Sequence, residues 1–289
     1  MTAVDLERLL RWYVEAGVDD AVGEDALDRT VVRERTRPAP EPAATVTAAP
    51  GAAPPAPARP LPPEPVRASA PAAALPPLDQ AALGARAIAA ACADLAALRA
   101  ALAAFDGCAL KHTATNLVFA DGNPSASVMF IGEAPGADED REGLPFVGAA
   151  GKLLDRMLAA IGLDRTQAYI TNILPWRPPG NRKPTPNEYA ICLPFVRRHI
   201  ELVAPKVLVL IGGTSAAALL GTGEGITRIR GRWHQYRSDP ERPSAPIPTM
   251  PTFHSAYLLR TPALKRDSWR DLIEIRRRLD EETARQSAG

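Results

Sequence analysis

Short apolar runs alternate with amphipathic stretches along the second half of the chain. The apolar runs are rich in β-branched residues and are bounded by glycine, proline and polar residues, so they predict strands. They lie at residues 125–132, 168–174, 206–212 and 247–253. Helical spacing of apolar residues appears at 150–161, 186–202, 214–220 and 262–282. Strands and helices that alternate in this way predict a mostly parallel sheet covered by helices on both faces.

The first 80 residues follow other patterns, and the chain divides into three predicted regions. Apolar residues at helical spacing behind Asp5, from Leu6 to Val14, predict an amphipathic helix within residues 1–36. Residues 37–79 are dominated by proline and alanine, which offer little area to bury, and predict an extended, disordered linker. Residues 80–289 contain the predicted strands and form the third region.

Charge and cysteine usage narrow the class of protein. The formal net charge is +1, so any nucleic-acid contact has to come from a local cluster of cations. The three cysteines are far apart in the sequence, which is typical of a reducing compartment rather than of a disulfide framework. Neither a signal peptide nor an apolar stretch of membrane-spanning length is evident, and we expect a cytoplasmic protein without a membrane segment.

The loop after the first predicted strand, GEAPGADEDREGLPFVG at 132–148, is rich in glycine but too acidic to bind a phosphate. It lacks the sequence of a P-loop, a dinucleotide-binding turn or a nucleophile elbow. Carboxylates at a strand end suit the positioning of a water or the stabilisation of a cation, and Phe146 offers a flat apolar face for a planar base. The alternative is a solvated acidic turn with Phe146 in the core.

Two further loops follow the strands whose carboxyl ends we expect at the same edge of the sheet. Asn172 ends the second strand, and its amide matches the O4 and N3–H edge of uracil, although it could equally cap the strand. His254 follows the last strand, where a histidine is either catalytic or structural. Cations suited to phosphates lie in the same loops, at Arg177, Arg182, Lys183 and Arg260.

Together the three loops resemble the motifs of the family 4 uracil-DNA glycosylases. The matching segments are GEAPGADEDREGLPFVGAAGKLLD, TNILPWRPPGNRKPTPNE and TFHSAYLLRTPALKR, and the resemblance covers about residues 105–280. It implies a three-layer α/β/α sandwich around a four-stranded, mostly parallel sheet. It also implies a monofunctional DNA glycosylase that flips uracil out of DNA and hydrolyses the N-glycosidic bond, which initiates base excision repair.

The resemblance assigns roles residue by residue. Phe146 would stack on the flipped uracil, Asn172 would bind its polar edge, and His254 would donate to its O2. Glu133 and Glu139 would hold the water or balance the charge of the sugar. The implied catalytic residues are Glu133, Glu139 and His254; the uracil-binding residues are Gly132, Ala134, Phe146 and Asn172; the DNA-binding residues are Gly148, Arg177, Arg182, Lys183, Ser255, Arg260 and Lys265.

The chain departs from the family pattern in two places. Members usually carry four cysteines that bind a [4Fe-4S] cluster, but Phe105 and Trp176 stand at two of these positions and only Cys108 and Cys192 remain. Two thiolates cannot hold a four-iron cluster in the usual way, so we expect no cluster, no other cofactor and no metal. Ser255 replaces the usual proline after the histidine, and its hydroxyl is a candidate phosphate ligand.

Two other functions are compatible with the same motifs. One is a non-catalytic module that binds DNA or uracil, and the other is a glycosylase that accepts a broader range of deaminated bases. The expected partner is uracil-containing DNA, with a repair protein as a second candidate that would bind the N-terminal helix. We expect a monomer that is associated with the nucleoid during repair.

Overall fold

A computed structural model describes residues 78–238 and 245–287. The predicted N-terminal helix region, 1–36, lies outside the described residues, as does the predicted linker except for its last two positions. Helix α2 begins at Leu78, two residues before the predicted start of the third region.

One six-stranded sheet forms the centre of the described part of the chain. Its order is β1-β3-β2-β4-β6-β5, and the four inner strands are parallel. The strands are β1 Asp121–Gly122, β2 Val128–Gly132, β3 Ala168–Asn172, β4 Val207–Ile211, β5 His234–Tyr236 and β6 Ile247–Thr252. The four inner strands confirm the predicted ones, and the sheet has two antiparallel edge strands in addition. These edges escape prediction because they are two and three residues long and have no apolar run.

The helices alternate with the inner strands, as the apolar spacing predicts. They are α2 Leu78–Ala91, α3 Leu95–Ala104, α4 Ala137–Glu142, α5 Ala149–Ala160, α6 Pro186–Val203, α7 Gly213–Leu220, α8 Ile226–Ile229, α9 Ser255–Arg260 and α10 Lys265–Ser287. Three short 3-10 turns join them: η1 Ala109–His112, η2 Pro179–Asn181 and η3 Pro262–Leu264. Among the described helices, every one is too short or too polar to cross a bilayer.

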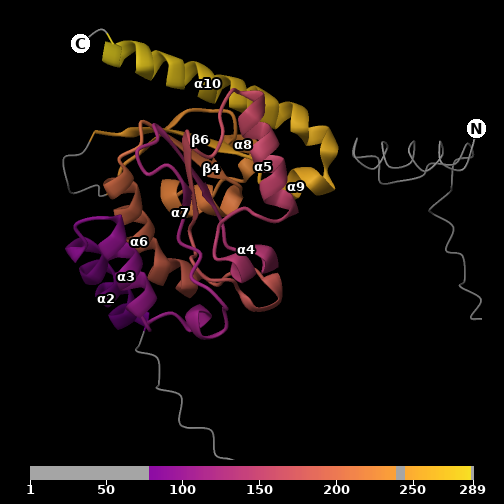
Figure 1. The fold of residues 1–289 in the computed structure, drawn as a ribbon. Helices are drawn as coiled ribbons and strands as arrows, with labels where there is room; N and C mark the ends of the chain where they lie inside the picture. The colour runs from indigo at the N-terminus through magenta and orange to yellow at the C-terminus, as the bar shows by residue number, and fades with distance from the viewer. Residues whose placement is uncertain (1–77, 239–244, 288–289) are drawn as a thin grey trace, which may run out of the picture. The chain divides into compact units, whose positions relative to one another are not determined.

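Alternating side chains of the inner strands build two separate cores, one on each face of the sheet. Met129 and Ile131 of β2 point into a core shared with α2, α3, α6 and α7. Val128 and Phe130 point the other way, into a core shared with α5, α9 and α10. Figure 1 shows these two groups of helices on either side of the sheet. The architecture is therefore a three-layer α/β/α sandwich, as the sequence predicts.

Candidate active site

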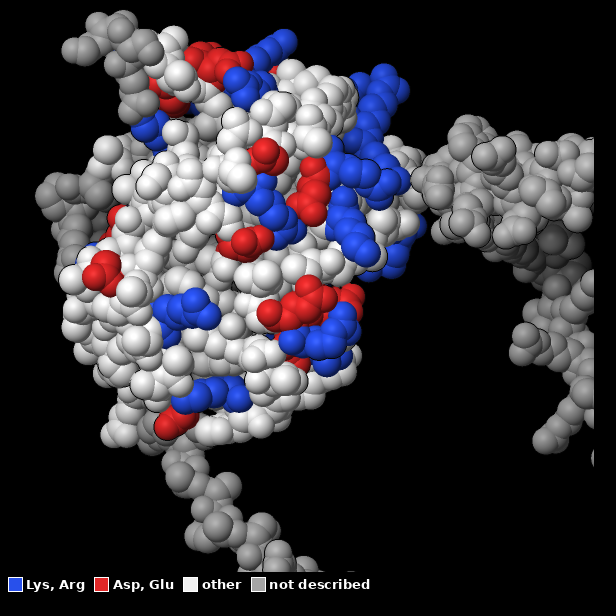
Figure 2. Space-filling model, viewed as in Figure 1, with Lys and Arg blue, Asp and Glu red and all other residues white. Residues whose placement is uncertain are grey.

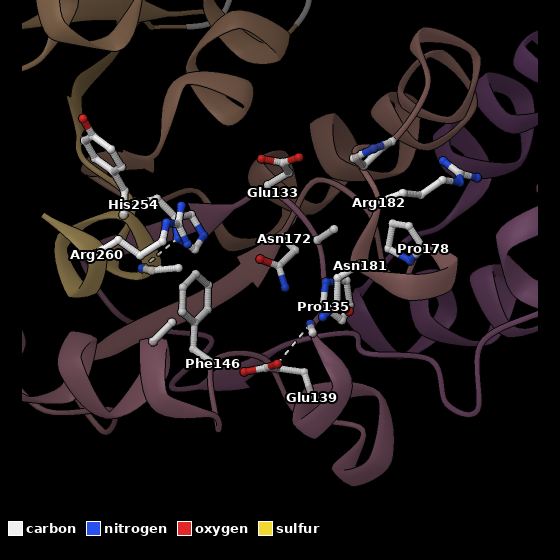
Figure 3. Close-up of a pocket in the computed structure, with 16 residues that line it drawn as sticks. Glu133, Pro135, Glu139, Phe146, Asn172, Pro178, Asn181, Arg182, His254 and Arg260 are labelled. Carbon is white, nitrogen blue, oxygen red and sulfur yellow. Dashed lines mark hydrogen bonds between the residues drawn. The ribbon is translucent and has the colours of Figure 1, made fainter. Parts of the chain in front are cut away.

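The three predicted loops meet in one cavity at the carboxyl ends of the inner strands. Gly132 ends β2 and lies in register with Asn172 at the end of β3, while His254 comes two residues after β6. The cavity has a volume of about 430 Å³, and Glu133, Phe146, Asn172 and His254 all line it. Figure 3 shows the side chains of these residues converging on the same space.

Asn172 presents an unused acceptor to the cavity. Its side chain is only 5% exposed, and its Oδ1 has no hydrogen-bond partner among the residues that the structure describes. A buried polar atom without a partner costs free energy, so it marks a place where a ligand would supply the missing bond. Gly132 makes room for this amide, because a Cβ at that position would overlap both the Asn172 Oδ1 and the Phe146 ring.

A backbone hydrogen bond to one ring nitrogen of His254 fixes the orientation of the ring and leaves the other nitrogen available to a ligand. Its Nδ1 accepts a hydrogen bond of 3.1 Å from the backbone N–H of Ala256, at the start of α9. The neutral ring therefore carries its proton on Nε2, which can donate. Burial lowers the pKa of His254 below its usual value, and the charge of Arg260 acts in the same direction while those of Glu133 and Glu139 oppose both. The ring lies 5.7 Å from that of Phe146, in a stacked arrangement.

Phe146 has a backbone conformation that needs support. Its φ is 56°, in the left-handed region that non-glycine residues rarely adopt. Arg165 donates to the carbonyl oxygens of Pro145 and Phe146, and its guanidinium also pairs with Asp121 and Asp155 at 2.5 and 2.8 Å. Arg165 thus fixes the turn that presents the phenyl ring to the cavity.

Glu139 organises the backbone of the acidic loop. Its Oε2 accepts from the N–H of Gly136 at 3.0 Å, and its Oε1 accepts from the N–H groups of Val147 and Gly148 at 3.0 and 2.9 Å. The side chain borders the cavity, as predicted, but three backbone donors already occupy its oxygens. This arrangement favours a positioning role for Glu139 over direct contact with the sugar or the water.

Glu133 is held by a tyrosine from another element. The hydroxyl of Tyr189, in the first turn of α6, donates to Glu133 Oε1 at 3.1 Å. Burial and the nearby Glu133 charge raise the pKa of Tyr189 well above its usual value, so the phenol keeps its proton and remains a donor. This bond fixes one oxygen of Glu133, while the carboxylate as a whole lines the cavity.

The predicted DNA-binding residues differ in where the structure places them. Arg260 and Arg182 line the cavity, and Lys183 is exposed beside it. Arg182 also pairs with Glu188 through both of its terminal nitrogens, at 2.6 and 3.0 Å, and so supports the start of α6. Arg177 donates to the Asn181 side chain at 2.7 Å, which closes the basic loop. These two arginines therefore stabilise the conformation of the loop and also give it positive charge.

Ser255 is a correction to the sequence-based expectation. It is 0% exposed, and its Oγ is buried without a hydrogen-bond partner in the part of the chain that the structure describes. As the first residue of α9, it turns its side chain into the protein, and a DNA phosphate cannot reach it there. Of the other predicted residues, Ala134 lines the cavity, Gly148 is the residue before α5, and Lys265 begins α10.

Comparison with known proteins decides the family. The profile of the uracil DNA glycosylase superfamily matches residues 119–273. The chain belongs to this superfamily. It is 41% identical over 174 residues to the type-4 uracil-DNA glycosylase of Sulfurisphaera tokodaii, covering 58% of this chain and 77% of the relative. The corresponding enzyme of Archaeoglobus fulgidus is 41% identical over 172 residues, which is 58% of this chain and 84% of the relative.

A third relative, the type-4 uracil-DNA glycosylase of Thermotoga maritima, is 40% identical over 154 residues, covering 53% of this chain and 77% of the relative. The predicted membership of family 4 is therefore confirmed. The matched residues 119–273 contain all three site loops and the whole central sheet.

The sequence motifs did not identify three residues that help to build the site in this superfamily member. Arg165 and Tyr189 act from outside the three loops, and only their types, a cation and a phenol, could have been noted in the sequence. Asp140 lies inside the first loop but is not a solvated turn residue, since it is 5% exposed. It accepts from the N–H groups of Thr115 and Asn116 at 2.8 and 3.2 Å, and so ties α4 to the segment after η1.

The residues at the family's usual cluster position do not fit a [4Fe-4S] cluster. Cys108 and Cys192 are buried with their sulfurs 4.0 Å apart, and the ring of Phe105 packs edge-on against Phe195 at 5.1 Å. Trp176 is also buried in this core. Within residues 78–238 and 245–287, no cluster of three or more histidines, cysteines and carboxylates could hold a metal ion. Four ligands are needed for the cluster, and two are present.

Proposed function

We infer that this chain is a uracil-DNA glycosylase, a monofunctional hydrolase that removes uracil from DNA and leaves an abasic site. The observation that carries this conclusion is the cavity in which Asn172, Phe146, His254 and Glu133 come together. A base inside a stacked duplex is out of reach of these groups, so the nucleotide has to turn out of the helix to enter the cavity. The relatives named above support the same activity.

We propose that Asn172 reads the polar edge of the base. Uracil offers a donor at N3–H and an acceptor at O4, and these match the free Oδ1 and the amide N–H of Asn172. The Phe146 ring would supply the apolar plane on which the base stacks. The C4 amino group of cytosine removes both the O4 acceptor and the N3–H donor and so leaves the buried amide without its partners, which is the strongest form of discrimination available to a small pocket.

We propose that His254 stabilises the leaving base. When the bond between C1′ and N1 breaks, the electron pair stays on the uracil and negative charge develops at O2. The neutral His254 can donate from Nε2 to this oxygen, because Nδ1 is already held by Ala256. One such donor is worth about 3 kcal/mol of transition-state stabilisation. Glu133 would position the water that attacks C1′ and accept its proton, and Glu139 would keep the loop in shape.

The direct test uses an end-labelled oligonucleotide with a single uracil, followed by alkali. Strand breakage only after alkali is the expected result, and matched strands with thymine or cytosine should stay intact. Breakage without alkali would point to a lyase, and binding without breakage would favour the non-catalytic module. Strands with hypoxanthine or xanthine in the same position test the broader deaminated-base specificity.

We also propose that this activity needs no iron–sulfur cluster, because Phe105 and Trp176 occupy two of the four ligand positions. Iron and acid-labile sulfide in anaerobically purified protein should be below one atom per chain, with no broad visible absorbance. A double variant, Phe105→Cys with Trp176→Cys, prepared in parallel is a positive control for cluster incorporation. Stoichiometric iron and sulfide in the unmodified protein would overturn the proposal.

The partner is uracil-containing DNA, and we propose that a single copy of the chain suffices, since all the groups named above come from one copy. Excision at a rate per chain that does not depend on protein concentration, together with a monomer in gel filtration, is the expected result. A repair partner for the N-terminal helix and an association with the nucleoid stay predictions.

A further inference from the structure

Five cations on α5, α9 and the start of α10 face solvent without a carboxylate partner. Lys152, Arg156, Arg260 and Arg266 are exposed, and Lys265 is half-exposed. Among the residues that the structure describes, none of the five forms an ion pair. We call these five residues the cationic face. In Figure 2, Lys and Arg side chains gather over the region that Figure 1 labels α5 and α9.

Most other arginines of α10 are in a different situation. Arg276, Arg277 and Arg285 pair with carboxylates one turn away on the same helix, at 2.6, 2.7 and 3.0 Å. The acidic residues close to the cationic face are also engaged elsewhere, since Asp155 pairs with Arg165 and Asp267 lies 3.4 Å from Arg270. The charge of the cationic face is therefore not neutralised from within the described part of the protein.

The cationic face adjoins the mouth of the cavity on one side. Arg260 belongs to both, because it also lines the cavity. Helix α9 packs against α5, and only the short turn η3 separates α9 from α10. Helix α5 itself begins immediately after the turn that carries Phe146. A strand whose base enters the cavity can therefore continue over these helices, where the exposed carboxylate of Asp155 is already paired with Arg165.

A different side of the same mouth is acidic. Helix α4 exposes Asp138 and Glu142 around Arg141, which pairs with them at 2.9 and 3.2 Å. In Figure 2 these red and blue side chains form a compact group below the cationic face. Such a group offers no net attraction to a phosphate chain. The charges around the cavity thus favour DNA over the cationic face and not over α4.

We propose that the cationic face binds the phosphate backbone of the DNA that flanks the flipped uridine. Lys152, Arg156 and Arg266 are assigned here as phosphate contacts in addition to the residues of the cavity loops. The assignment rests on the proposed function, since the DNA bound by the cationic face is the same substrate whose uracil enters the cavity. Binding of this kind depends on salt, because each phosphate that a cation neutralises releases condensed counterions.

The test compares two triple variants that remove the same net charge. Lys152→Gln, Arg156→Gln and Arg266→Gln change the cationic face, and Arg276→Gln, Arg277→Gln and Arg285→Gln change paired arginines on α10. For each variant, kcat/KM on a uracil-containing duplex is measured over a range of NaCl concentrations. The slope of log kcat/KM against log salt should fall by about 0.9 for each lost contact, so by roughly two to three in the first variant.

Only the first variant should show this change, and its excision rate at saturating DNA and its thermal midpoint should stay close to those of the unmodified protein. Equal changes in slope for the two variants, or an unchanged slope in the first, would overturn the assignment. Either of those results leaves uracil excision itself intact. Failure of the proposed function would instead appear as absent excision by the unmodified protein at low salt.

Discussion

The cavity and the packed region around the two thiols differ in how well their buried groups are satisfied. The cavity keeps an amide oxygen without a partner at Asn172 and a phenylalanine at φ 56°. The two-thiol region, which consists of Phe105, Cys108, Trp176 and Cys192, is closed by aromatic rings in a continuous core. The first arrangement costs stability and leaves polar groups available to a ligand, whereas the second contributes stability through close packing.

This contrast indicates that substitutions in one of the two regions of this superfamily member need not affect the other. Asn172, Phe146, His254 and Glu133 all line the cavity, whereas only two cysteines, Cys108 and Cys192, lie in the two-thiol region. Because stability and catalysis are carried by different groups, single substitutions should separate them. Changes in the two-thiol region should lower the free energy of unfolding, and changes in the cavity should lower the excision rate.

The largest effect on stability is expected for Phe105→Ala. The substitution removes a buried ring that packs on Phe195, and large-to-small changes of this kind cost about 3–5 kcal/mol. Urea unfolding measures the loss, and excision per folded molecule should stay within about twofold, on the argument that the ring does not reach the cavity. A fall in catalytic rate as large as the fall in stability would show that the two regions are coupled.

Asn172→Ala should produce the reverse pattern. Loss of the amide that we propose to bind the uracil edge should reduce single-turnover excision by about 10²- to 10³-fold, as for other preorganised polar groups in active sites. The free energy of unfolding should change by less than about 1 kcal/mol, because the removed Oδ1 makes no hydrogen bond to any residue that the structure describes. If excision proceeds at the parental rate, the assignment of the pocket is wrong.

Arg165→Met tests whether the strained turn at Phe146 is held from outside the loop. Displacement of the ring by about 1 Å should reduce the rate at saturating DNA by up to about 10²-fold. The matched control is Arg198→Met, since Arg198 also donates to a backbone carbonyl, that of Cys92, at 3.0 and 2.8 Å. The control should lower stability without slowing excision. Equal effects of the two variants on the excision rate would contradict the positioning role of Arg165.

Tyr189→Phe is expected to have the smallest effect. The ring stays in place, and the hydrogen bonds of its hydroxyl to Glu133 and Thr214 are lost, so we expect about a tenfold lower rate at saturating DNA with an unchanged KM. Tyr169→Phe is the control, because its hydroxyl bonds the buried His199 at 2.9 Å and Tyr169 does not line the cavity. A single-turnover measurement that finds both variants at the parental rate would show that Glu133 needs no partner.

The sequence predicts the inner sheet and the cavity well, for a physical reason. Parallel strands buried on both faces appear as continuous apolar runs, and their carboxyl ends lie at one edge whatever the loops contain. Asn172 and His254 could be placed from this rule and from the family motifs. The contacts of Arg165 and Tyr189 could not, because they join segments that lie 19 and 56 residues apart.

The burial of individual polar side chains also could not be predicted from the sequence. Ser255 and Asp140 are short polar residues in segments that the sequence predicts as loops, and loops of this composition are usually solvated. The structure buries both, since the first begins α9 and the second anchors the segment after η1. Whether a polar side chain faces water depends on the packing of distant elements, and one loop motif does not contain that information.

The two short edge strands have a consequence for the behaviour of the protein in concentrated solution. An inner strand with a free edge would offer its N–H and C=O groups to any other chain that approaches it. Here β1 covers the free edge of β3 for two residues, and β5 covers that of β6 for three. Both covering strands are short, and Gly122 bends the first with a φ of 95°. Segments with no apolar signal in the sequence thus protect the sheet against edge-to-edge aggregation between copies.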